Sequence, residues 1–325
     1  MNTPPPHDAI LRVSIVIPAF NHGAYVAEAI ESVLRQDYPQ VELIVIDDGS
    51  TDNTRHVLET YAGRARVMSQ PNAGQAATIN RGWTESSGDL VSYLSADDRL
   101  EPAAVSQAVA TLEAQPEAVL AYGDYDLIDP ASRFVRHVTT PEYDYTRMVA
   151  SIQCAPGPGV FIRRWAAEQA GGWNPGFRQA PDFEYWLRLS LLGPFVRIPQ
   201  VLAGLRVHPG STSYAAAAPE RSEEMVRMME AYFARPDLPE SARAVRDQAL
   251  SSAHLWAARS HLRSSRMGHA VRSLRKASAL SSSTVLSLET ARLLSNALVN
   301  RAGHRALWHI RGLFSGRPDS SGSRP

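Results

Sequence analysis

The sequence has little of what marks several classes of protein. Its 325 residues include a single cysteine, Cys154, which excludes an internal disulfide and any cysteine-rich zinc site. No stretch approaches the roughly 18 uncharged apolar residues that a membrane-spanning helix needs. The opening residues, MNTPPPHDAI, lack the cationic start of a signal peptide. These absences predict a cytoplasmic protein.

Three common nucleotide-binding or catalytic motifs are also missing. The segment Pro18–Gly23 stands after the first apolar run, where a dinucleotide-binding domain would carry Gly-x-Gly-x-x-Gly. Neither a Gly-Lys-Ser/Thr phosphate loop nor a Gly-x-Ser-x-Gly nucleophile elbow occurs. If the ligand carries phosphate, a metal ion rather than a glycine-rich loop with a lysine is therefore expected to meet its charge.

Charge is distributed unevenly along the chain although the net charge is zero. Residues 1–240 hold 19 basic and 30 acidic side chains, whereas residues 241–325 hold 14 basic and 3 acidic ones. This asymmetry predicts different surroundings for the two segments.

Short β-rich runs alternate with helical patterns over the first 125 residues. The runs predict strands at 13–17, 41–46, 66–69, 90–94 and 118–122, with amphipathic helices between them. That order predicts an α/β fold with a mostly parallel, Rossmann-like sheet flanked by helices. Ligands of such sheets bind at the carboxyl ends of the strands, where the strand order reverses.

The remaining sequence predicts a second, helical part. A mixed pattern, with an apolar run at 160–162, a helix at 183–192 and a strand at 201–207, is followed by helices at 217–233, 239–264, 267–280 and 285–312. We therefore expect a sheet domain over 10–215 and a helical extension over 216–314. The polar segment 315–325 predicts a disordered tail.

Acidic side chains follow two of the predicted strands. Asp97 and Asp98 come after the strand at 90–94, and two adjacent carboxylates can hold a divalent cation that binds a diphosphate. The alternative is a turn that caps the next helix. Asp47 and Asp48 leave the same choice, between a turn and a carboxylate that accepts hydrogen bonds from a base or a ribose.

Two further residues could take part in chemistry. His208 ends a strand and could be an additional metal ligand, although a lone histidine is more often structural. Asp182 opens a helix, as a simple cap or as a general base. Glu184 and Arg188, one turn apart, are expected to pair with each other.

Taken together, these motifs resemble the family 2 glycosyltransferases, inverting enzymes of the GT-A fold, over about residues 12–212. The segments that carry the resemblance are Val13–Asn21, Val45–Asp52, Asn72–Gln75 with Asn80–Gly82, Tyr93–Asp98, Gly157–Gly159, Asp182 with Trp186 and Arg188, and His208. Each segment alone is weak evidence, but their order along the chain is specific.

The resemblance assigns roles to individual residues. It implies a catalytic base at Asp182 and metal ligands at Asp97, with Asp98 as the competing assignment, and His208. It also implies that the donor nucleotide is bound by Pro18, Ala19, Phe20, Asn21, Asp47, Asp48, Gln75, Asn80, Ser95 and Ala96. Two departures stand out: Ser95 replaces the first aspartate of the family's Asp-x-Asp motif, and Pro181 precedes Asp182 where glutamate is usual.

The implied activity is metal-dependent sugar transfer from a nucleoside diphosphate-sugar, preferentially a UDP-sugar, to an acceptor hydroxyl. Mg²⁺ or Mn²⁺ is the implied cofactor, and a saccharide or a lipid-linked acceptor is implied, in cell-surface polysaccharide or glycoconjugate biosynthesis. The alternatives are a non-catalytic nucleotide-sugar-binding protein and a nucleotidyltransferase. The latter would need an early basic triphosphate-binding loop, yet residues 14–30 contain no lysine or arginine.

The basic C-terminal helices pose a separate question. Arg263, Arg266, Arg272, Arg275 and Lys276 could lie against anionic lipid headgroups at the inner face of a membrane, or could form a solvated helical face. Little aromatic interleaving accompanies them, so nucleic-acid binding is not expected.

Overall fold

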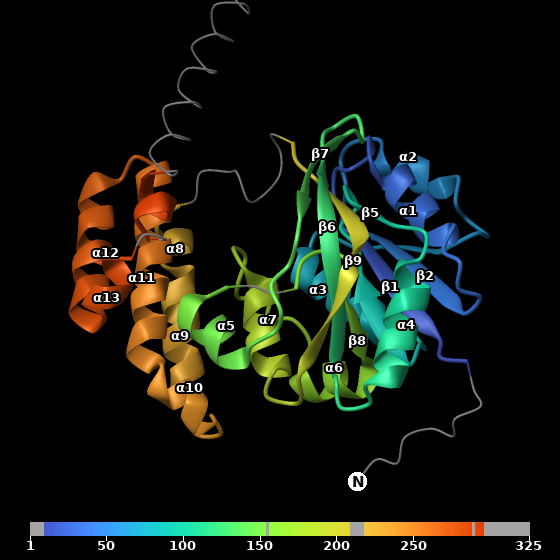
Figure 1. The fold of residues 1–325 in the computed structure, drawn as a ribbon. Helices are drawn as coiled ribbons and strands as arrows, with labels where there is room; N and C mark the ends of the chain where they lie inside the picture. The colour runs from blue at the N-terminus through green and yellow to red at the C-terminus, as the bar shows by residue number, and fades with distance from the viewer. Residues whose placement is uncertain (1–9, 154–155, 209–217, 288–289, 296–325) are drawn as a thin grey trace, which may run out of the picture. The chain divides into compact units, whose positions relative to one another are not determined.

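The computed structural model describes residues 10–153, 156–208, 218–287 and 290–295. They form two compact units, one from residues up to 149 together with 153–214, and one from residues 150–152 together with those from 215 onward. The first unit contains the sheet and the second contains a set of helices (Figure 1). Cys154 and the predicted tail at 315–325 lie outside the described residues.

The first four strands form a parallel half of the sheet in the order β3-β2-β1-β4. They are β1 (Val13–Ala19), β2 (Val41–Asp47), β3 (Arg66–Ser69) and β4 (Leu90–Tyr93), connected by α1 (Val26–Leu34), α2 (Thr54–Glu59) and α3 (Gln75–Thr84). β2 and β3 are added in turn on one side of β1, and β4 then pairs with the other side of β1. The strand order therefore reverses between β1 and β4, the place where α/β sheets bind ligands.

The other half of the sheet mixes parallel and antiparallel pairs. Its strands are β5 (Arg99–Leu100), β6 (Leu120–Ile128), β7 (Phe134–Val138), β8 (Phe161–Arg163) and β9 (Phe195–Arg206). β6 pairs with β9 in parallel. The other pairs are antiparallel: β8 lies between β4 and β6, β5 pairs with β9, and β7 pairs with β6. The helices here are α4 (Ala104–Ala114), α5 (Tyr145–Ser151), α6 (Arg164–Ala170) and α7 (Pro181–Leu189). The predicted α/β fold with a mostly parallel sheet is confirmed.

Side chains of β1 enter apolar layers on both faces of the sheet. Ile15 and Ile17 belong to the same buried cluster as Ile30 of α1. Val16 faces α3, because a Cβ added to Gly82 would lie 2.4 Å from Val16 Cγ1. A strand covered on both faces is apolar at nearly every position, which explains why this run identifies the strand from sequence.

Helices make up the second unit, as the sequence predicts. They are α8 (Pro219–Ser222), α9 (Glu224–Phe233), α10 (Glu240–Ala244), α11 (Arg246–Arg263), α12 (Met267–Leu280) and α13 (Ser282–Val285). α11 packs against both α9 and α12 (Figure 1). The buried ring of His261 bonds to Glu223 through Nε2 (2.8 Å), and its Nδ1 accepts from Arg266 Nε (3.0 Å), which ties the start of α9 to α11 and α12.

Several boundaries differ from the sequence prediction. β9 begins at Phe195, six residues before the predicted strand at 201. The sequence does not predict this first part, because Pro199 lacks the amide hydrogen expected of a strand residue. Its pairing with β6 shifts register at this point, where Ile198 and Val201 face consecutive residues of β6. The predicted helix at 285–312 lies largely outside the described residues. Among those residues, no helix has both the length and the apolar character required to span a bilayer.

Replacing Gly82 with alanine is expected to lower the free energy of unfolding by about 1–3 kcal/mol, because the added methyl group collides with Val16 in a packed layer. The loss should outweigh the roughly 1 kcal/mol by which alanine is favoured over glycine inside a helix. Urea unfolding followed by circular dichroism measures the change.

Gly268→Ala in α12 is the matched control, because an added Cβ there meets no atom within 4 Å. It should leave stability unchanged or raise it slightly. In the double variant Gly82→Ala/Val16→Ala the collision is relieved, so the two losses should be less than additive. Fully additive losses would contradict this packing.

Candidate active site

Asn21 ties the end of β1 to the loop that follows β2. Its backbone is left-handed, with φ at 56°, a conformation that asparagine tolerates better than most residues. The side-chain Oδ1 accepts hydrogen bonds from the amides of Thr51 (2.8 Å) and Asp52 (3.3 Å). α1 begins only at Val26 and has no side-chain cap, so Asn21 does not cap this helix. The residue joins two loops instead.

The buried carboxylate of Asp48 holds the segment 70–74 against the same edge of the sheet. Its two oxygens accept three hydrogen bonds, from Gln70 Nε2 (2.7 Å) and from the amides of Ala73 and Gly74 (2.8 Å each). Asp47 is also buried, and its Oδ1 accepts from the Ser50 amide at 3.0 Å. Both aspartates therefore organise the loops that follow β2 and β3.

Asp97 and His208 are 111 positions apart in sequence but lie in direct contact. The two-residue strand β5 follows Asp98 immediately and pairs antiparallel with the end of β9, so that Arg99 faces Gly204. This pairing places the Asp97 loop beside the residues that follow β9. His208 Nε2 consequently lies 2.9 Å from Asp97 Oδ2, with both side chains mostly buried.

Asp98 faces away from this pair and into the sheet. Its Oδ1 accepts the backbone amide of Arg206 (2.8 Å), and only 4% of the residue is exposed. Burial, and then the neighbouring Asp97 carboxylate, raise the pKa of Asp98 well above its usual value. Of the two competing aspartates, Asp97 is the one that lies beside His208.

The guanidinium of Arg206, which has no exposed surface, links the surrounding segments. It donates to the backbone oxygen of Asp97 (2.7 Å), the backbone oxygen of Asp129 and Ser132 Oγ (2.9 Å each), and Glu28 Oε2 (2.7 Å). Its Cζ lies 4.8 Å from the centre of the Tyr25 ring, which in turn contacts His208 with ring centres 5.3 Å apart.

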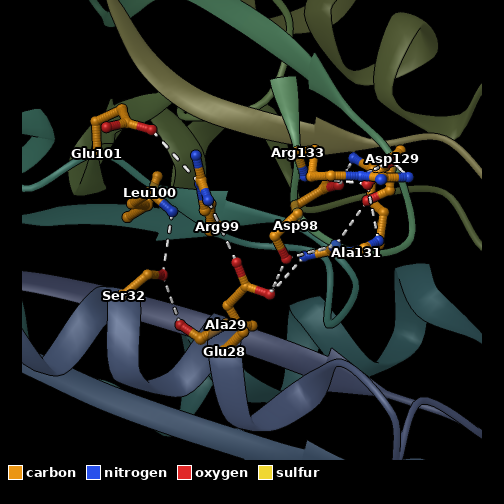
Figure 2. A network of polar contacts seen from close by, with 12 residues as sticks. Glu28, Ala29, Ser32, Asp98, Arg99, Leu100, Glu101, Asp129, Ala131 and Arg133 are labelled. Atoms are coloured by element: carbon orange, nitrogen blue, oxygen red, sulfur yellow. Dashed lines mark hydrogen bonds and ion pairs between the residues drawn. The ribbon is translucent and has the colours of Figure 1, made fainter. Parts of the chain in front are cut away.

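Glu28 of α1 extends this network toward β5. Figure 2 shows Glu28 paired with Arg99 (3.4 Å), which also pairs with Glu101 (3.6 Å). Nearby, Ser32 Oγ accepts the Leu100 amide at 3.1 Å. Helix α1 thus holds the short strand that directs Asp97.

A residue that the sequence analysis missed, His22, completes the cluster. Its Nε2 lies 3.8 Å from Asp97 Oδ2, and the donor atoms of His22, Asp97 and His208 all lie within 4.8 Å of one another. The composition of Asn21-His22-Gly23 is typical of a turn, so the sequence gives no sign that His22 lies beside Asp97. The available signal is its position directly after β1, at the edge where the strand order reverses.

Asp182 lies in the first turn of α7. Its Oδ1 accepts the amide of Phe183 (2.9 Å). Burial raises the pKa of Asp182 above its usual value, and the Phe183 hydrogen bond opposes that shift. One turn later, the predicted pair of Glu184 and Arg188 is confirmed, with Arg188 Nε 2.8 Å from Glu184 Oε1.

The remaining candidate residues belong to β1, to α3 and to the segments that follow β1 and β4. Pro18 and Ala19 are buried in β1, Phe20 is 42% exposed, Gln75 begins α3, and Ser95 and Ala96 precede Asp97. Asn80 uses both ends of its amide on the backbone of Trp173, at 2.8 Å through Nδ2 and 2.7 Å through Oδ1. That side chain therefore positions the segment leading to α7.

The cluster of His22, Asp97 and His208 fits a divalent cation by the chemistry of its donors. One carboxylate oxygen and two imidazole nitrogens are all recognised ligands of first-row divalent metals. The carboxylate supplies the negative charge, and the atoms are close enough to share one ion.

Comparison with known proteins points to one family. Residues 14–171 match the family model described as glycosyl transferase family 2. Chondroitin synthase of Escherichia coli is 30% identical over 205 residues, which are 62% of this chain and 30% of that protein. The chain spans about a fifth to a third of the length of such synthases.

Solved structures share the fold at low sequence identity. S. aureus TarS 1-349 in complex with UDP-GlcNAc superimposes with a TM-score of 0.62 at 20% identity, covering 90% of this chain and 80% of that one. The mannosyltransferase PcManGT of Pyrobaculum calidifontis, in complex with GDP-Man and Mn²⁺, gives 0.61 at 16% identity, covering 93% and 88%. The likeness extends beyond the segment that the family model matches.

Arg206→Ala is expected to lower the free energy of unfolding by about 3 kcal/mol, because it leaves Glu28 and two backbone carbonyls without their buried donor. Arg206→Lys should recover only part of the loss, because one ammonium cannot replace the planar set of donors. Chemical denaturation of the full chain measures both.

Arg133→Ala serves as the control for losing an arginine. That side chain is 79% exposed and pairs with Asp129, so its removal should cost less than about 1 kcal/mol. Equal losses for the two alanine variants would mean that the network around Arg206 contributes no special stability.

Proposed function

We propose that the protein transfers a sugar from a nucleoside diphosphate-sugar to an acceptor hydroxyl, with inversion at the anomeric carbon, because residues 14–171 match the family model described as glycosyl transferase family 2. The observation that supports this most directly is the contact between Asp97 and His208 beside the point of strand reversal. It gives a cation-binding pair where a nucleotide is expected in this type of sheet.

The proposed chemistry is a single displacement. The acceptor oxygen attacks the anomeric carbon and its proton passes to the Asp182 carboxylate, while the bond from that carbon to the diphosphate oxygen breaks. Base catalysis of this kind contributes about 10²–10⁴-fold to the rate. The raised pKa of Asp182 suits the role, because a base with a higher pKa accepts a proton more readily.

Asp97 and His208 are the residues that would hold Mg²⁺ or Mn²⁺. A bound ion there supplies positive charge that stabilises the departing diphosphate. The segments 18–21, 47–52 and 70–75 would contact the nucleoside, with Asp47 or Asp48 closest to the base. We favour a UDP-sugar as donor, a preference to which the UDP-GlcNAc held by TarS lends support.

The acceptor is proposed from chemistry and from the relatives. A growing saccharide agrees with the similarity to chondroitin synthase, and a lipid-linked saccharide agrees with the basic second unit. Either acceptor would place the protein in polysaccharide or glycoconjugate biosynthesis.

We further propose that α12 contacts an anionic membrane surface. Arg272, Arg275 and Lys276 are exposed, as are the apolar Met267 and Val271 on the same helix. No acidic residue occurs from 248 to 288. Such a surface fits the anionic cytoplasmic leaflet, where each cationic side chain contributes about 1 kcal/mol.

Asp182→Asn should reduce release of the nucleoside diphosphate by about 10²–10⁴-fold, because the amide cannot accept the proton. The donor is first chosen as the UDP-, GDP- or dTDP-sugar that raises the melting temperature most with Mn²⁺.

In the wild type the rate should fall as pH drops through the raised pKa of Asp182, since only the ionised carboxylate is a base. The decline should therefore begin at higher pH than for an ordinary aspartate, and the variant should lack it.

Asp247→Asn, at an exposed position in the second unit, is the control and should leave the rate unchanged. Donor binding should survive in Asp182→Asn, measured by the same melting shift. Retention of near wild-type turnover would refute the base assignment. Donor binding with no release of product in the wild type would instead favour the non-catalytic alternative.

The triple variant Arg272→Gln/Arg275→Gln/Lys276→Gln should weaken binding to vesicles containing phosphatidylglycerol by about 100-fold, from three losses of about 1 kcal/mol each. Co-sedimentation with these vesicles, and with neutral phosphatidylcholine vesicles, measures the partition. The control removes three exposed arginines elsewhere, at 55, 133 and 246. Equal partition of the two triple variants would exclude α12 as the contact.

A further inference from the structure

We propose that His22 is a third protein ligand of the metal held by Asp97 and His208, and that this donor set binds Mn²⁺ in preference to Mg²⁺. The inference rests on the proposed function, because it concerns the same cation site. It adds a residue at the end of β1 to a site otherwise built by the ends of β4 and β9.

The His22 ring is directed to the site by its backbone. The His22 amide donates to Thr54 Oγ1 (2.9 Å), and the next amide, of Gly23, donates to Asp52 Oδ2 (3.1 Å). The His22 carbonyl accepts the amides of Tyr25 and Val26, both at 2.9 Å. These bonds fix the backbone on both sides of the ring and leave Nε2 facing Asp97.

Two imidazoles approach one carboxylate oxygen from different elements. Asp97 Oδ2 lies 2.9 Å from His208 Nε2 and 3.8 Å from His22 Nε2. The two rings are nearly perpendicular, at 87°, with centres 6.4 Å apart. They therefore do not stack on each other, and both nitrogens can face a common point next to the carboxylate.

Donor type determines which ion such a set prefers. Mg²⁺ favours oxygen ligands and is normally bound through one or two carboxylates, substrate phosphates and water. Imidazole nitrogen suits first-row transition ions better than it suits Mg²⁺, and Mn²⁺, which also accepts oxygen ligands, stands at the weak end of that series. A second imidazole should therefore raise the affinity for Mn²⁺ more than that for Mg²⁺.

The size of the effect follows from how firmly the ring is held. A ligating histidine usually donates its other ring nitrogen to a partner, and loss of such partners costs about 10–100-fold in metal affinity. His22 Nδ1 is buried and has no hydrogen-bond partner among the described residues. Because this orienting interaction is lacking, we expect His22 to be a modest ligand whose removal lowers the affinity for Mn²⁺ about tenfold.

The test measures Mn²⁺ and Mg²⁺ binding to the full chain by calorimetry, with each metal alone and with saturating UDP. His22→Ala should raise the Kd for Mn²⁺ about tenfold and change the Kd for Mg²⁺ less, while His56→Ala, at an exposed position on α2, should change neither. His22→Glu replaces the nitrogen with oxygen, so it should shift the preference toward Mg²⁺. Pulsed EPR of Mn²⁺ bound to wild type labelled with ¹⁵N-histidine should show two coordinated imidazoles, and this measurement needs no variant to fold.

The outcomes separate this proposal from the proposed function. A spectrum with one imidazole, an unchanged Mn²⁺/Mg²⁺ ratio in the folded variants, or a wild type that binds neither metal with or without UDP would overturn the role of His22. If sugar transfer persists in those cases, the proposed function stands. Two coordinated imidazoles without release of product from any nucleotide sugar would refute the function and retain the metal site.

Discussion

The buried guanidinium of Arg206 is the interaction on which the geometry of the site depends most. It bonds the carbonyl of Asp97, a carboxylate on α1 and the turn at 129–132 at the same time. Because the group is fully shielded from water, each of its donors must find an acceptor within the protein. The ends of β4 and β9 are thereby held at a fixed spacing, which is also the spacing that brings Asp97 to His208.

This network lies next to the place where the topology already favours a ligand. β1 and β4 leave the sheet side by side, with connections that run in opposite directions from β1. Although Leu94 and Ala96 beyond β4 still belong to the core, one position beyond each strand lies outside the core cluster and is free to serve binding. His22 and Asp97 occupy these two positions, whereas Asp48 and Asn21 hold the adjoining loops.

The sequence predicts the parallel half of the sheet well and the other half less well, for physical reasons. Strands buried on both faces, such as β1, are apolar at nearly every position and therefore stand out. β5 has only two residues and leaves no usable pattern, and Pro199 obscures the first part of β9, of which the sequence predicts only 201–207. Yet the pairing of these two strands separates Asp97 from Asp98 and brings His208 into contact. Adjacent aspartates cannot be distinguished by spacing alone, and a histidine in a turn-like segment gives no periodic signal.

The carboxylate of Asp48, which accepts three hydrogen bonds from residues 70–74, has a consequence for recognition. Residues 70–74 are immobilised by bonds internal to the protein, so a ligand arriving at this edge does not have to order them. Ordering a flexible side chain on association costs about 0.5–1.5 kcal/mol. That conformational entropy has already been lost during folding. A rigid rim of this kind favours selection among ligands by shape, because a poorly fitting ligand cannot be accommodated by rearrangement of the loop.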